Sequence, residues 1–86
     1  MPNPFTPPPE GAPETVKGAY ALLAQKFERE QEARVRRDVA EQSNAPASEY
    51  LHAEKDLAFA EQETNNAASL FFDELRFAAD ENRKTA

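Results

Sequence analysis

One short breaker divides most of this chain into two long helix-forming segments. The breaker is Ser43-Asn44-Ala45-Pro46, and Pro46 is the only proline after Pro13. Because proline disrupts a helix interior, one helix is expected over about residues 13–42 and a second over about residues 46–82, joined by a turn at 43–46. Such a short link makes the two helices antiparallel. The sequence therefore predicts an all-α fold, an elongated antiparallel two-helix hairpin with coiled-coil-like packing.

The first helical segment carries an apolar seam at helical spacing. Its members follow one another at steps of four, three and four residues: Val16, Tyr20, Leu23 and Phe27. This spacing places all four side chains on one face of a helix. We expect the seam to turn polar after Phe27 and to resume at Val35 and Val39.

The second helical segment shows a heptad pattern with small residues at its centre. Five positions are spaced by seven: Tyr50, Leu57, Thr64, Phe71 and Ala78. The first three are each followed, three residues later, by an alanine: Ala53, Ala60 and Ala67. A heptad repeat of this kind predicts a helix–helix seam. Folding the chain about residue 44 brings Leu23 opposite Ala67, so that large side chains of one helix pack on small ones of the other.

The chain begins with a proline-rich arm at residues 1–12, which precedes the hairpin of residues 13–86. The arm reads MPNPFTPPPEGA, and its five prolines exclude a helix or a central strand. An extended, partly polyproline II segment is expected. Phe5 is its only aromatic residue and its only large anchor. Two interpretations stay open: a disordered tail, or a docking arm whose Phe5 fills a pocket.

The composition indicates that the hairpin needs a partner. Only 15 of the 86 residues are Leu, Val or Phe, there is no Ile, and the net charge is −6. Few large apolar residues and a high net charge approach the composition of disordered chains. A core this small rarely stabilises an independent domain by more than about 3–5 kcal/mol. We therefore expect a homo-oligomer or an obligate complex with another protein.

Aromatic and aliphatic residues over 70–79 cover more of the second helix than one neighbouring helix can bury. A single partner covers a stripe of about 100°, whereas these side chains occupy more than half of the circumference. Either the arm folds back over them, bringing Phe5 alongside, or another chain covers them. Phe59 points away from the seam and is a further hot-spot candidate. The predicted partner-binding residues are Phe5, Phe59, Leu70, Phe72 and Phe77.

The residues that carry chemistry are few. The chain has no Cys, one His and two Gly, so it offers no thiolate, no Ser-His-Asp arrangement and no glycine-rich phosphate loop. We predict no enzymatic activity, no catalytic residue and no cofactor.

One metal-site candidate remains. Glu49-x-x-His52 has the spacing used in carboxylate-bridged di-metal bundles, and Asp38 or Glu41 of the first helix would lie at the same height. In outline this arrangement resembles encapsulated ferritins, whose two-helix hairpins form rings with metal sites between subunits. The resemblance implies a metal-binding, ferritin-like hairpin that uses Glu49 and His52, as an alternative function. The competing interpretation is an exposed first-turn Glu and a solvated His.

A second alternative function follows from the acidic charge. Four carboxylates, Glu54, Asp56, Glu61 and Glu63, lie close together on the second helix. Such a face imitates a nucleic-acid backbone in some small inhibitors, although a solvated helix face explains it equally well. Direct nucleic-acid binding is not expected, because phosphate contacts need clustered Lys and Arg.

The function we predict is a non-enzymatic structural or interaction protein. It is expected to act as a small accessory subunit that docks through its arm and its aromatic helix surface onto a larger assembly. A phage particle is the preferred assembly, by analogy with arm-plus-helix pieces of virions. With no apolar run long enough to span a bilayer and no signal-peptide pattern, we expect a cytoplasmic or particle-associated protein without a membrane partner.

Overall fold

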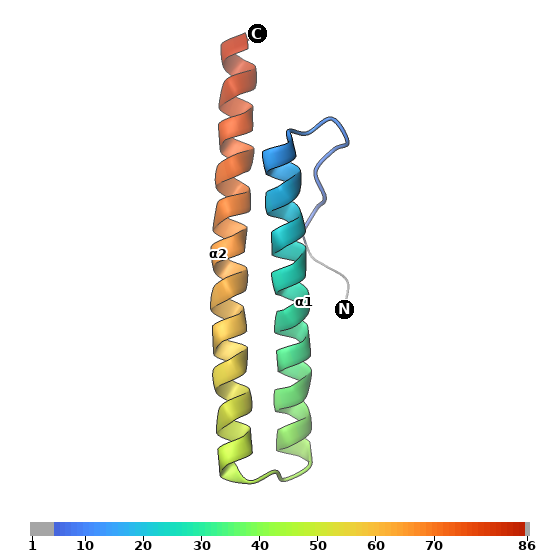
Figure 1. The fold of residues 1–86 in the computed structure, drawn as a ribbon, viewed down its shortest axis with the longest axis vertical. Coiled ribbons are helices and arrows are strands. Elements are labelled where there is room, and N and C mark those ends of the chain that lie inside the picture. Colours follow the sequence, from blue (N-terminus) through green and yellow to red (C-terminus); the bar gives the residue numbers. More distant parts are fainter. Residues whose placement is uncertain (1–4, 86) are drawn as a thin grey trace.

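The computed structural model describes the backbone of residues 5–85 and the side chains of residues 5–81. Residues 5–85 contain two helices, α1 (Glu14–Gln42) and α2 (Ala47–Thr85), and no strand. The helices run antiparallel as a hairpin, and α2 extends past the beginning of α1 (Figure 1). The molecule measures 60 × 19 × 14 Å. The predicted all-helical hairpin is confirmed, with α2 ending at Thr85 rather than near residue 82.

Backbone hydrogen bonds define the loop between the helices. The Ser43 N–H donates to the carbonyl of Val39 at 2.9 Å and closes the last turn of α1. Asn44 follows with a φ of 53°, in the left-handed region that Asn tolerates better than most residues. The Pro46 carbonyl then accepts the N–H of Tyr50 at 3.1 Å and opens α2. The chain therefore reverses within four residues.

The main apolar core lies in the half of the hairpin farther from the loop. Its buried members are Val16, Ala19, Leu23, Ala67 and Phe71. Leu23 is fully buried, and the rings of Tyr20 and Phe71 pack with their centroids 5.6 Å apart. Large side chains of α1 thus meet small ones of α2 at Leu23 and Ala67, as the heptad pattern predicts.

The predicted continuation of the α1 seam through Val35 and Val39 is wrong. These side chains are 60% and 57% exposed, whereas Ala33 is buried. At 100° per residue, Val35 and Val39 lie about 120° and 160° around the helix from Leu23, while Ala33 lies only about 80° away. The seam follows the coiled-coil repeat through small and polar residues, and the two valines fall on the outer side of α1.

The half of the hairpin nearer the loop is held by a thinner core and by ion pairs. Leu57 and Thr64 are buried, and the Thr64 hydroxyl donates to the carbonyl of Ala60 in its own helix at 3.0 Å. Lys26 of α1 forms an ion pair with Glu63 of α2. Surface ion pairs of this kind stabilise a fold by only about 0–1 kcal/mol. Polar contacts therefore replace much of the apolar packing here.

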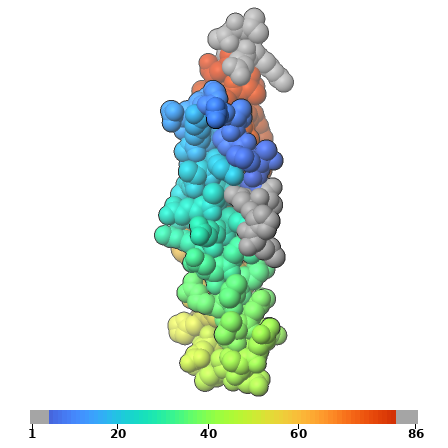
Figure 2. Space-filling view, turned by 90° about the vertical axis from the view of Figure 1, so that its right-hand side faces the viewer, coloured from blue at the N-terminus to red at the C-terminus, as the bar shows by residue number. Residues whose placement is uncertain are grey.

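The described part of the arm, residues 5–13, turns back along α1 (Figure 2). Phe5 stands edge-on to Phe27, and the Tyr20 hydroxyl donates to the Phe5 carbonyl at 3.4 Å. Phe5 therefore packs on the middle of α1 and also against the core cluster that contains Phe71 of α2. Residues 1–4 of the predicted arm lie outside the described residues.

Candidate protein-docking surface

The arm lies beside α2 and leaves a hollow between them. This hollow has a volume of about 410 Å³, and arm residues and α2 residues line it: Phe5, Thr6, Pro7, Pro8, Pro9, Phe71, Phe72 and Leu75. Phe71 is buried beneath it, but Phe72 stays 50% exposed. We call this surface the arm groove. The arm therefore covers only part of the aromatic surface of α2.

The opposite side of the hairpin has no such cover from the described part of the chain. Four large apolar side chains are exposed there, and we call them the open face: Leu22, Phe59, Leu70 and Phe77. Leu22 and Leu70 line one shallow hollow, and Phe59 lines a second beside it. At 100° per residue, Phe77 falls within about 20° of Phe59 and Leu70 around α2, and Phe72 falls about 160° from Leu70. The helical pitch thus divides the aromatic residues of α2 between two sides.

The two rims of the open face carry opposite charge. On the α1 rim lie Lys26, Arg29 and Arg36, with Glu32 as the acidic exception. On the α2 rim lie the carboxylates of Asp56 and Glu63. Of these charges, Lys26 and Glu63 pair with each other within the chain. The open face is therefore an apolar row between a basic edge and an acidic edge.

The predicted partner-binding residues fall into three environments. Phe5 is half-buried against its own α1. Phe72 borders the arm groove, and Phe59, Leu70 and Phe77 belong to the open face. Leu22 was missed by the sequence prediction, although its position one residue before the seam residue Leu23 places it at the seam's edge.

Glu49 and His52 lie together on the surface near the loop. They line a hollow of about 220 Å³ with Ala33, Arg36, Ala53 and Asp56. The positive charge of Arg36 in that lining would repel a metal cation bound at Glu49 and His52. Asp38, one of the proposed additional ligands, accepts a hydrogen bond from Arg37 at 3.0 Å instead. Among residues 5–81, no group of three or more His, Asp or Glu side chains is arranged to hold a metal ion.

The four carboxylates proposed as a nucleic-acid mimic are mostly engaged within the chain. Glu63 pairs with Lys26, and a Glu61 oxygen lies 3.8 Å from the Arg34 guanidinium. Glu54 accepts the Tyr50 hydroxyl at 2.9 Å. This hydrogen bond raises the pKa of Tyr50, because it stabilises the protonated phenol beside a carboxylate. The acidic side chains thus have local structural contacts rather than forming an unpaired array.

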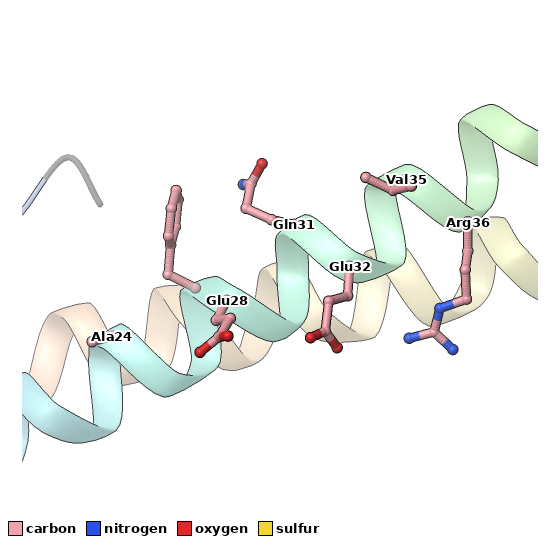
Figure 3. A pocket seen from close by; sticks show the side chains of 7 residues that line it. Ala24, Glu28, Gln31, Glu32, Val35 and Arg36 are labelled. Carbon is pink, nitrogen blue, oxygen red and sulfur yellow. The ribbon is translucent and has the colours of Figure 1, made fainter. Parts of the chain in front are cut away.

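A further hollow of about 770 Å³ lies on the outer side of α1 (Figure 3). Gln31 and Val35 point to one side of it, and Glu28, Glu32 and Arg36 point to the other. The remaining lining residues are Ala24 and Phe27. The lining contains no Ser, Thr, Cys, Lys or His side chain, and its charged members are Glu28, Glu32 and Arg36.

The chain was compared with protein families, curated proteins and solved structures. No family model, curated protein or solved structure matches this chain. In the described part of the chain, neither helix is apolar enough over a sufficient length to cross a membrane. The strongest functional feature of the molecule is therefore its exposed aromatic surface.

Proposed function

We propose that this chain is a non-enzymatic interaction subunit that docks onto a larger protein assembly. The observation that carries the proposal is the exposure of Phe72 and Phe77, at 50% and 63%, although the arm already packs over Phe71. Exposed aromatic side chains on a thin rod are typical of interface hot spots, and these two lie on different sides of α2. A phage particle stays the preferred assembly by analogy, and the geometry adds nothing to that choice.

The arm supports the proposal by shaping one side of the docking surface. Residues Pro7, Pro8 and Pro9 form a preordered wall beside Phe72, because proline restricts the backbone before any partner binds. A partner that packs against Phe72 would also contact this wall. The metal-binding and inhibitor functions rest on the sequence patterns alone, and no specific contact favours either.

Incorporation into the native assembly tests the proposal. Phe72→Ser and Phe77→Ser are expected to release the subunit, so that it no longer co-sediments with the assembly from its native source. Leu51→Ser is the matched control, since Leu51 is exposed on the side of α2 away from α1. The proposal is wrong if the wild-type chain sediments free of any larger particle, or if all three variants stay bound.

A further inference from the structure

The open face has the form of a second helix–helix seam without a partner. Phe59 and Phe77 bound it along α2, a distance of about 27 Å at 1.5 Å per residue. Leu70 lies between them, and Leu22 of α1 lies beside Leu70 across the shallow groove. All four side chains are exposed. Three apolar residues of α2 and one of α1 thus share this face, and pairing such faces forms the core of a four-helix bundle.

We infer that a second copy of this chain covers the open face, so that two hairpins form a four-helix bundle. This inference rests on the proposed interaction function and names the partner of one of its surfaces. A symmetric pair requires a patch that complements itself. The open face meets that condition, because its α1 rim is mainly basic and its α2 rim acidic.

The charge pattern also selects one of two possible arrangements. With the two-fold axis along the rod, α1 of each copy faces α2 of the other, and the two loops lie at the same end. With the axis across the rod, α1 faces α1 and α2 faces α2, so like charges meet. The first arrangement brings Arg29 of each copy toward Asp56 and Glu63 of the other. Attraction between opposite rims therefore favours loops at the same end.

The intrachain contacts set the register of this pair. Lys26 contacts Glu63 within the hairpin, so residues whose numbers sum to about 89 share a height along the rod. Leu22 lies near the height of Leu70, and both line one hollow. With the axis along the rod, heights are preserved between copies. Leu22 of one copy then packs on Leu70 of the other, and this contact occurs twice.

A stable dimer must bury the charged rims as well as the open face itself. The four apolar residues span about 27 Å of a rod 19 Å wide, an area smaller than the roughly 800 Å² per partner of a standard interface, so Arg29, Asp56 and their neighbours belong to the contact. The core of the hairpin is small, since its buried apolar residues are Val16, Ala19, Leu23, Ala33, Leu57, Ala67 and Phe71. A second hairpin would convert Leu22, Leu70 and Phe59 from surface into core.

Sedimentation equilibrium of the full chain is the first test. A dimer of twice 9.6 kDa is expected at micromolar concentrations. Leu70→Asp should weaken the dimer at least about tenfold, as for a central interface residue, while circular dichroism shows retained helix. Leu51→Asp is the matched control on the far side of α2 and should leave the dimer intact. A monomer at all concentrations overturns the inference, and so does an unchanged dimer in Leu70→Asp.

Cysteine crosslinking tests the arrangement, since the natural chain contains no Cys. Leu22→Cys and Leu70→Cys chains are mixed and oxidised. We expect crosslinked heterodimers from the mixture and little crosslinking of either variant alone. Crosslinking of each variant to itself, without heterodimers, would show the like-on-like arrangement and overturn the proposed pairing.

Charge reversal separates the same two arrangements by an independent route. Arg29→Glu and Asp56→Arg should each weaken the dimer, and the double variant should restore it. Failure of the dimer leaves the proposed function testable, because Phe72 lies on the other side of α2. If Leu70→Asp is monomeric yet still co-sediments with the native assembly, the dimer inference holds and docking is independent of it. If Phe72→Ser fails to release a dimeric chain, the proposed function is wrong and the dimer stands.

Discussion

The ring of Phe5 stands edge-on to the ring of Phe27, with centroids 6.1 Å apart and planes at 88°. This contact joins the proline-rich arm to the middle of α1, and Phe5 is the only aromatic residue of the arm. The Tyr20 hydroxyl reinforces it by donating to the Phe5 carbonyl. The arm is therefore attached to the hairpin at an aromatic contact and a backbone hydrogen bond.

Replacing Phe5 should measure how much the arm stabilises the fold. Phe5→Ala is expected to lower the free energy of unfolding by about 1–2 kcal/mol, through lost apolar burial and the lost edge-to-face contact. Urea unfolding followed by circular dichroism gives the value. Leu51→Ala is the control, with a change within about 0.5 kcal/mol because Leu51 is exposed. An equal effect of both variants would show that the arm does not stabilise the hairpin.

Leu23 and Val39 offer a matched comparison of a true seam position with a mistaken one. Leu23→Ala should cost about 2–4 kcal/mol, because it opens a cavity in the main core. Val39→Ala should change the stability by less than about 0.5 kcal/mol, since its side chain is 57% exposed. Urea unfolding at one fixed protein concentration compares the two. A large loss in Val39→Ala would place this valine in an interface.

Gly18 lies within α1, and apart from its chain neighbours and the surrounding helix backbone no atom lies within 4 Å of the position that a Cβ would occupy. Gly18→Ala should therefore raise stability by about 0.5–1 kcal/mol through helix propensity alone. Thermal unfolding by circular dichroism detects this as a higher melting temperature. A lower melting temperature would indicate that another chain approaches the backbone closely at Gly18.

Tyr50 should ionise at higher pH than an ordinary tyrosine, because its hydroxyl donates to the Glu54 carboxylate and this raises the Tyr50 pKa above 10.0. The stabilisation from this bond is fully present below pH 10 and is lost as the pH rises through the folded-state pKa. Tyrosinate absorbance follows the titration in a Tyr20→Phe background, where Tyr50 is the only tyrosine. Adding Glu54→Ala should lower the midpoint. An unchanged midpoint would mean that the two groups do not interact in solution.

The helices and the loop were predictable because their signals are local. Pro46 can only sit near a helix start, and the heptad spacing of Leu57, Thr64 and Phe71 places all three on one buried face. The pairing of Leu23 with Ala67 followed from folding the chain about the loop, since both belong to the buried cluster. These features depend on the spacing of residues along the sequence and not on contacts between distant side chains.

Other features were not predictable from apolar residues alone. Val35 and Val39 look like seam residues by composition, but the helix period carries the seam through Ala33 instead. The path of the arm depends on long-range contacts of Phe5 with Phe27 and Tyr20 that no periodicity encodes. The charge difference between the rims of the open face likewise emerged only when Arg29 and Asp56 were brought to one surface.

The concentration of buried apolar side chains around Leu23 and Phe71 gives the rod an uneven resistance to opening. Local unfolding requires least free energy where few apolar contacts are lost. Separation of the two helices should therefore begin beside Asn44 and progress away from the loop. Over the length where the two helices are paired, backbone amides flanking the reversal would exchange their hydrogens soonest, while those near Leu23 would be the last to exchange.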